Sequence, residues 1–206
     1  MSMSAPRRST ATATADKIRA AAAALFVIRN YADVTIDQVA DAADLTKGAV
    51  YHHFHSKERL YVDALLHDLD KKRRLHVSAA KTGGTCRERL RTLTASFLAL
   101  PGDERKLIQL VRRDSNIFDD ETRAQLVQAY QAALPDPIEG ILRDGIRDGE
   151  IIPCDPRLLA WQFVATVEVL LTEYADQRFS CDDDKLNYVM SVFFGGCQAT
   201  SPGGDA

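Results

Sequence analysis

The chain has 206 residues, with 26 Lys and Arg against 29 Asp and Glu, which gives a formal net charge of −3. Hydrophobic residues make up 46% and charged residues 27%, a composition typical of soluble globular proteins rather than of disordered or membrane proteins. The overall charge argues against a protein that coats nucleic acid with its whole surface. A local basic surface is still compatible with it, because residues 1–80 hold 12 Lys and Arg against 9 Asp and Glu, whereas residues 81–206 hold 14 against 20.

The cysteines are widely spaced, at positions 86, 154, 181 and 197, and no pair has the Cys-x-x-Cys spacing of a zinc site. We therefore expect reduced thiols, a cytoplasmic location and no bound metal or cofactor. A metal sensor that combines these cysteines with His67 or His76 is the alternative. No run of 18 or more apolar residues occurs, so we expect no membrane span.

The first part of the chain is predicted to hold four helices. From Asp16 an apolar stripe at spacings of three and four residues indicates the first helix, which runs to about Arg29. Thr35 precedes a helix of about two turns, and Thr46 precedes a helix that ends near Phe54; both hydroxyls can cap the helix that follows. Ser56 is a third cap, at the start of a long fourth helix.

The rest of the chain is also predicted to be helical, which makes the fold class all-α. The expected helices span about 86–100, 104–113, 120–134, 138–148, 156–178 and 183–195, and they are separated by Pro and Gly residues. No alternating strand pattern and no internal repeat is found.

The two last predicted helices, 156–178 and 183–195, are apolar on nearly every side. Such helices have to be buried on nearly every side, and a second copy of the chain could supply part of that burial. We expect the pair to meet its symmetry mate in a four-helix bundle, with Leu170, Leu171, Val189 and Phe193 at the interface of a homodimer. The alternative is a helical core within a monomer.

The two short helices over Thr35–Phe54 have the spacing of a helix-turn-helix, whose second helix enters the DNA major groove. Lys47 places a positive charge at the positive end of the helix dipole, which slightly lowers the stability of the helix. An anion bound from outside would reverse this effect. Gly48 costs up to roughly 1 kcal/mol of helix stability relative to Ala, yet it lets a backbone approach closely. Lys47 shares one row of the helix with Tyr51, and Gly48 another with His52. This face suits phosphates and base edges; a merely solvated polar face is the alternative.

The segment TKGAVYHHFHSKERL from Thr46 to Leu60, with TIDQVA from Thr35 before it, resembles the DNA-binding signature of TetR-type transcriptional regulators. Lys-Gly-x-x-Tyr-x-x-Phe followed by Ser-Lys-Glu is highly specific. The family usually has Gly in the turn where this chain has Asp44, a residue type that tolerates the left-handed conformation. The resemblance implies that Val50 and Phe54 pack inward. It also implies a set of residues at or near DNA, in which Lys57 holds a phosphate: Thr35, Thr46, Lys47, Gly48, Ala49, Tyr51, His52, His53 and Lys57.

The resemblance further implies a dimeric repressor of a pseudo-palindromic operator, released when a small ligand binds the C-terminal domain and moves the fourth helix. The implied domains are a flexible arm over 1–11, a DNA-binding domain over 12–60 and a ligand-binding and dimerisation domain over 61–200. Arg7 and Arg8 on the arm could follow the DNA backbone or enter a minor groove. The ligand cavity could be lined by Arg112, Phe118, Tyr130, Trp161, Gln162 and Thr166, for each of which ordinary core packing is the alternative.

A helical enzyme or ligand carrier is the remaining alternative. It would need a nucleophile with a base, or paired carboxylates, in one pocket. The one dense acidic group, Asp182–Asp184, is typical of a loop and a helix cap. No catalytic motif is found, and we expect that the protein is not an enzyme.

Overall fold

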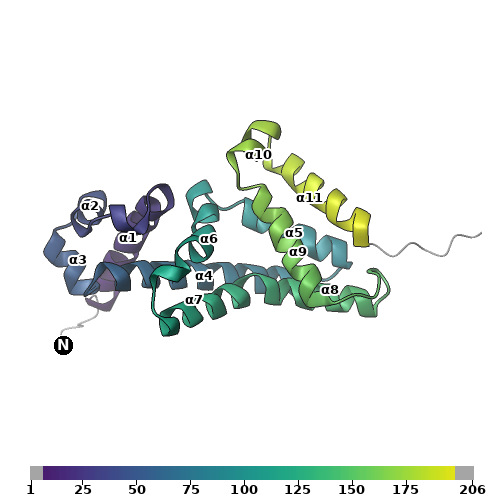
Figure 1. The fold of residues 1–206 in the computed structure, drawn as a ribbon, viewed down its shortest axis with the longest axis horizontal. Coiled ribbons are helices and arrows are strands. Elements are labelled where there is room, and N and C mark those ends of the chain that lie inside the picture. The colour runs from purple at the N-terminus through teal and green to yellow at the C-terminus, as the bar shows by residue number, and fades with distance from the viewer. Residues whose placement is uncertain (1–6, 198–206) are drawn as a thin grey trace, which may run out of the picture. The chain divides into compact units, whose positions relative to one another are not determined.

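The computed structural model describes residues 7–197, which form helices joined by short loops and contain no β-strand (Figure 1). The all-α prediction is confirmed. The described residues form two compact units. The N-terminal unit comprises Met1–Asp68 and Gly102–Val127, and the C-terminal unit comprises Leu69–Pro101 and Gln128–Ala206. The division runs through α4 and α7, so each of these helices contributes residues to both units.

The N-terminal unit contains α1 (Arg7–Ile28), the 3-10 turn η1 (Tyr31–Asp33), α2 (Ile36–Ala42), α3 (Lys47–His53), the start of α4 (Lys57–Ala80), α6 (Gly102–Asp114), η2 (Ser115–Ile117) and the start of α7 (Asp120–Ala133). Helix α1 packs against α2 and α6, and α2 packs against α3. Buried Ile18, Phe26, Val39, Val50 and Leu60 make up much of its core.

The first helix is longer than expected. It begins at Arg7, so residues 7–11 are helical where the sequence pattern predicts a flexible arm. The segment from Arg7 to Ala11 gives no apolar period, but Arg and Ala have high helix propensities, and a helix already nucleated downstream extends at little cost. Residues 1–6 of the expected arm, and the side chains of Arg7 and Arg8, lie outside the described part of the chain.

The C-terminal unit contains the end of α4, α5 (Cys86–Leu98), the end of α7, α8 (Pro135–Arg147), α9 (Pro156–Val169), α10 (Glu173–Arg178) and α11 (Asp182–Cys197). Helix α8 packs against α5 and α9, and α11 packs against α5 and α9. Pro135 and Pro137 lie in the first turn of α8, where no intrahelical N–H is lost. The helix predicted over 156–178 is instead two helices, because Thr172 caps α10 and starts a new N-terminus.

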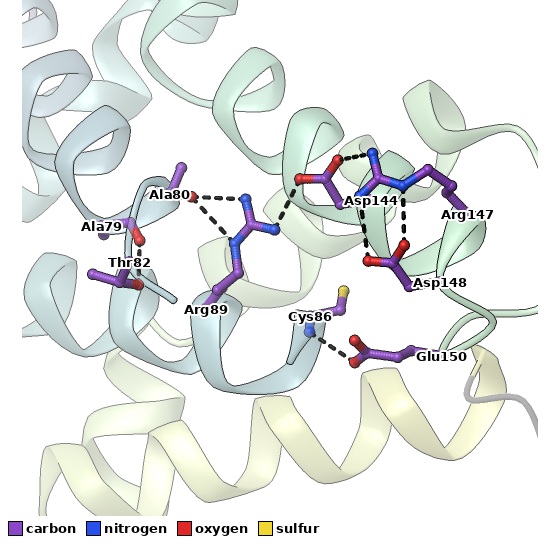
Figure 2. Close-up of polar contacts among 9 residues, drawn as sticks. All are labelled: Ala79, Ala80, Thr82, Cys86, Arg89, Asp144, Arg147, Asp148 and Glu150. Carbon is purple, nitrogen blue, oxygen red and sulfur yellow. Dashed lines mark hydrogen bonds and ion pairs between the residues drawn. The ribbon is translucent and has the colours of Figure 1, made fainter. Parts of the chain in front are cut away.

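A half-buried arginine holds the end of α4, α5 and α8 together (Figure 2). Arg89 of α5 donates to the Ala80 carbonyl at 2.7 and 3.2 Å and to Asp144 of α8 at 2.9 Å. The last carbonyls of a helix have no partner within the helix, so this guanidinium satisfies one of them on α4. The same ion pair lowers the pKa of Asp144.

The start of α5 packs tightly on the end of α8. The Cys86 N–H, at the N-terminus of α5, donates to the Glu150 carboxylate at 2.7 Å (Figure 2). A Cβ added at Gly145 would lie 2.7 Å from the Cys86 Cβ, so only glycine allows this approach. Gly149 ends α8 with a φ of 76°, as the glycine in this position predicts.

Candidate nucleic-acid interface

The N-terminus of α2 is closed by a capping box. Thr35 Oγ1 accepts from the Gln38 N–H at 3.2 Å, and the Thr35 N–H donates to Gln38 Oε1 at 3.0 Å. The cap predicted at Thr35 is therefore confirmed. The side chain is exposed, so Thr35 lies on the surface at the free end of α2.

Helix α3 starts at the predicted cap and presents the predicted face. Thr46 Oγ1 accepts from the Ala49 N–H at 3.2 Å. Val50 and Phe54 are buried, as the resemblance implies. The residues expected at DNA lie on the opposite side: Thr46, Lys47, Gly48, Tyr51 and His52 are exposed, and Ala49 and His53 are half-buried.

Gly48 has no structural reason to be glycine. Its backbone is helical, and a Cβ added there would meet only Thr46 Oγ1, at 3.9 Å. A glycine inside a helix lowers stability relative to alanine, and nothing within the chain compensates for that cost. The gap that Gly48 leaves faces outward, where a close approach by another molecule is the remaining use for it.

Lys47 forms a surface ion pair that joins α2 and α3. Its Nζ lies 2.8 Å from Asp37 Oδ2, and the hydrogen bond and charge of that carboxylate raise the pKa of Lys47. Both side chains are more than half exposed. Exposed pairs of this kind contribute little to stability, so a phosphate can replace Asp37 as the partner of Lys47 at little cost.

The turn between α2 and α3 adopts the conformation expected for it. Asp44 has a φ of 50°, and it is the only non-glycine residue with positive φ in the described part of the chain. The Leu45 N–H then bonds back to the Ala40 carbonyl at 2.9 Å. Asp in place of the usual Gly therefore keeps the turn, with its carboxylate exposed and 3.9 Å from Lys17 Nζ.

Lys57 differs from the role that the resemblance implies. Its Nζ donates to the Tyr31 carbonyl at 2.9 Å and the Val34 carbonyl at 3.1 Å, with the Ala32 carbonyl at 3.4 Å. The ammonium also lies 4.3 Å from the centroid of the Tyr31 ring. An ammonium has three N–H donors, and here they are directed at the loop before α2, which leaves none for a phosphate in this conformation.

The end of α6 is bonded to α1 and α4, a relationship that the sequence analysis did not identify. Arg113 donates to the Phe26 and Arg29 carbonyls at the end of α1, at 3.2 and 3.3 Å. Buried Asp114 accepts hydrogen bonds from Tyr61 of α4 and from Arg113. Burial, and then the Asp114 hydrogen bond, strongly raise the pKa of Tyr61. No local pattern in the sequence signals these bonds, because the partners of Arg113 in α1 and of Asp114 in α4 lie more than 50 residues away.

The residues expected to line one ligand cavity are divided between the two units. Arg112, which is exposed, and Phe118, which is buried among Tyr31 and Tyr61, belong to the N-terminal unit. Tyr130 and Trp161 belong to the C-terminal unit, where their rings stack with centroids 5.9 Å apart. Spacing along a helical sequence does not tell which helices share a core, so a single cavity lined by all six residues stays a prediction.

Gln162 and Thr166, the two polar residues of that set, line an open groove of about 420 Å³ in the C-terminal unit. The groove lies along α9 and α11, and its other residues are Ile152, Cys154, Leu159, Val192, Phe193 and Gly196.

The residues expected at a dimer interface are buried within the chain. Leu170, Leu171, Val189 and Phe193 are 0 to 7% exposed, so they pack inward and leave little surface for a second copy. A helix that is apolar on every side gives no sequence signal for the side that turns inward. The exposed apolar residues of these helices are Leu158, Val169, Tyr188 and Val192.

Two further expectations concern metals and membranes. Among the described residues, no group of three or more His, Cys, Asp or Glu side chains could hold a metal ion. Cys86 is buried, whereas Cys154 and Cys181 are exposed. None of the described helices is long and apolar enough to cross a membrane.

Comparison with known proteins identifies two regions of the chain. Residues 18–64 match the family of bacterial regulatory proteins of the tetR type, and residues 83–174 match the tetracycline-repressor-like C-terminal domain. The chain is 22% identical to the uncharacterised HTH-type transcriptional regulator YhgD of Bacillus subtilis, over 84% of this chain and 90% of YhgD.

Solved structures share the fold. AibR in complex with isovaleryl coenzyme A and operator DNA is 22% identical, with a TM-score of 0.74 over 87% of this chain and 97% of AibR. FadR of Bacillus subtilis in complex with stearoyl-CoA is 20% identical, with a TM-score of 0.73 over 87% of this chain and 97% of FadR. The two matched regions together cover more than half of the chain. The families that they match are transcriptional regulators and not enzymes. The chain belongs to the TetR family of bacterial transcriptional regulators, which bind DNA through a helix-turn-helix.

Proposed function

We propose that this regulator is a homodimeric repressor in the cytoplasm that binds a pseudo-palindromic operator and leaves it when a small effector binds the C-terminal domain. The observation that carries the DNA-binding part is the surface of α3, where Gly48 has no packing role and lies beside exposed Lys47 and Tyr51. A helix-turn-helix dimer reads two half-sites about one helical turn apart, which requires a two-fold operator.

In this proposal α3 enters the major groove. Its exposed and half-buried residues supply the contacts: Thr46, Lys47, Gly48, Ala49, Tyr51, His52 and His53. Thr35, exposed at the end of α2, approaches the backbone. Lys57 acts by holding the loop over residues 31–34 in place and does not hold a phosphate.

The dimer surface is proposed to lie on the exposed apolar side of α9 and α11. Val169 and Leu158 of α9 are 57% and 64% exposed, and Val192 of α11 is 51% exposed. Exposed apolar residues that gather on two adjacent helices mark an interface more often than scattered ones do. A second copy is the occupant that fits, because two such helix pairs complete a four-helix bundle.

The effector is proposed to be an acyl-CoA thioester. Support comes from AibR and FadR, which share the fold over most of the chain and hold isovaleryl coenzyme A and stearoyl-CoA.

The test begins with a selection of bound sequences from random duplex DNA, followed by titration of the selected site. We expect a two-fold site, tight binding at low salt and a steep loss of affinity as salt rises. Isovaleryl-CoA or stearoyl-CoA should release the DNA, whereas coenzyme A alone should not. Lys47→Ala and Tyr51→Ala should lose binding but stay folded. Absence of any sequence preference would overturn the DNA-binding part, and release by neither thioester would overturn the effector class.

A further inference from the structure

His76 is a histidine sealed inside the C-terminal unit. It lies near the end of α4 and is 1% exposed, with its ring 6.0 Å from that of Phe97 on α5. Its Nδ1 lies 2.7 Å from the Ala133 carbonyl oxygen. A carbonyl oxygen only accepts, so Nδ1 carries the proton and donates it.

The other ring nitrogen, Nε2, has no hydrogen-bond partner among the described residues. Burial, with a further contribution from the charge of Lys72, lowers the pKa of His76 to about 4. The ring is therefore neutral near pH 7. With its proton on Nδ1, the neutral ring presents a lone pair at Nε2, and this tautomer is fixed by the Ala133 carbonyl.

A buried acceptor without a partner is uncommon in folded proteins and calls for an explanation, of which a donor from a bound molecule is one. What pairs with a lone pair is an O–H or N–H donor. A carboxylate oxygen or a thioester carbonyl at the same place would set lone pair against lone pair. Lys72, one turn earlier on α4 and fully buried, adds a positive charge to the same region, which disfavours a cationic donor.

We propose that His76 Nε2 is a recognition point of the effector site and accepts a hydrogen bond from a neutral hydroxyl or amide donor of the effector. This inference rests on the proposed function only in taking the C-terminal domain as the effector's location. For a thioester of coenzyme A, the donor is a hydroxyl or amide N–H of the pantetheine arm, or a hydroxyl on the acyl chain, and never the thioester carbonyl.

The test uses two probes of nearly equal size, phenol, which donates a hydrogen bond, and fluorobenzene, which does not. Thermal unfolding of the full chain is measured with each probe for wild type, His76→Phe and His76→Gln. We expect phenol to raise the Tm of wild type more than fluorobenzene does. His76→Phe should remove this difference, and His76→Gln, whose amide oxygen can accept, should restore part of it.

A nuclear magnetic resonance measurement keeps the inference testable if a variant fails to fold. In wild type with ¹⁵N-labelled histidine, the Nε2 resonance of His76 should move on addition of phenol and stay in place with fluorobenzene. Equal Tm shifts from both probes, an unmoved Nε2 resonance, or a phenol preference that survives in His76→Phe would overturn the inference.

Release of operator DNA separates this inference from the proposed function. If phenol acts through His76 but neither isovaleryl-CoA nor stearoyl-CoA releases the operator, the inference about His76 is supported and the proposed effector class is wrong. If the thioesters release DNA from wild type and from His76→Phe equally well, and phenol raises the Tm no more than fluorobenzene does, the effector class is supported and the proposed role of His76 is wrong.

Discussion

Lys57 Nζ donates to the carbonyl of Tyr31 at 2.9 Å while it lies over the ring of the same residue, 4.3 Å from its centroid. The ammonium thus fixes both the backbone and the side chain of the residue at the start of η1. Because Thr35 follows directly after this loop, Lys57 determines where the N-terminus of α2 lies on α4.

Replacing Lys57 with Met should weaken operator binding through lost positioning. The slope of log affinity against log salt should stay the same, because no phosphate contact is removed. Replacing Lys47 with Met should make the slope shallower by about one. Titrations at four or five salt concentrations measure both. A slope in Lys57→Met that is shallower by the same amount would show that Lys57 does contact a phosphate.

Replacing Gly48 with Ala should have opposite effects on stability and on binding. The free energy of unfolding should rise by up to about 1 kcal/mol, because alanine favours the helix. Operator affinity should fall by roughly tenfold or more, about 1.4 kcal/mol, because the new methyl group occupies the gap that faces DNA.

Gly140 offers a matched control for that substitution. It is an exposed glycine within α8 with nothing within 4 Å of an added Cβ. Gly140→Ala should give a similar gain in stability and leave operator affinity unchanged. Unaltered affinity in Gly48→Ala, measured beside it, would mean that α3 does not approach DNA at this residue.

The free energy of unfolding should fall between pH 7 and pH 5, in part because of His76. Its pKa is lowered to about 4 in the folded chain, whereas the unfolded chain has the ordinary value of about 6.5. The unfolded state therefore binds a proton in this range that the folded state does not. The expected contribution is about 2 kcal/mol at pH 5.

Urea unfolding at several pH values, compared between wild type and His76→Phe, isolates this contribution. The variant should lose less stability than wild type between pH 7 and pH 5. Glu88, Asp119 and Asp144 have lowered pKa values and lose their contributions only at lower pH. Parallel pH profiles for the two proteins would contradict a neutral, buried His76.

Tyr61→Phe should reduce stability by about 1 to 3 kcal/mol, because buried Asp114 loses the hydroxyl that donates to it. Tyr51→Phe is the control, since Tyr51 is 42% exposed and lies on α3. It should leave stability within about 0.5 kcal/mol of wild type. Chemical unfolding gives the free energy of unfolding of both variants. Equal values for the two would show that the Tyr61–Asp114 hydrogen bond does not stabilise the fold.

The dimer surface is tested by two valines three residues apart on α11. Val192 is 51% exposed, whereas Val189 is fully buried. Val192→Asp should give a folded monomer, because a charge on the interface opposes association. Val189→Asp should disrupt folding, because it buries an unpaired charge. Sedimentation and circular dichroism distinguish these outcomes, and a Val192→Asp protein that remains dimeric would place the interface elsewhere.

The sequence allowed good prediction where the signal is local. The caps at Thr35 and Thr46 and the inward face of α3 depend on residues within a few positions of each other, and periodicity and capping chemistry report these directly. The contacts of Lys57 and Arg113 could not be predicted, because their partners lie more than 20 residues away.

The apolar helices near the end of the chain were harder for a different reason. Leu170 and Val189 are as hydrophobic as exposed Val169 and Val192, so composition cannot tell the inner face from the outer one. Only the packing of α9 and α11 on each other and of α11 on α5 makes that distinction.

The bonds from Arg113 to the end of α1 set a limit on how this protein can be divided. Residues 102–127 follow the first stretch of the C-terminal unit in sequence, yet they belong to the N-terminal unit. A chimera that takes residues 1–68 from this chain and the remainder from a relative would pair α1 with a foreign α6. Exchange of DNA specificity between regulators of this kind therefore requires two separate segments to be transplanted together, and a single crossover point in α4 would produce a poorly folded hybrid.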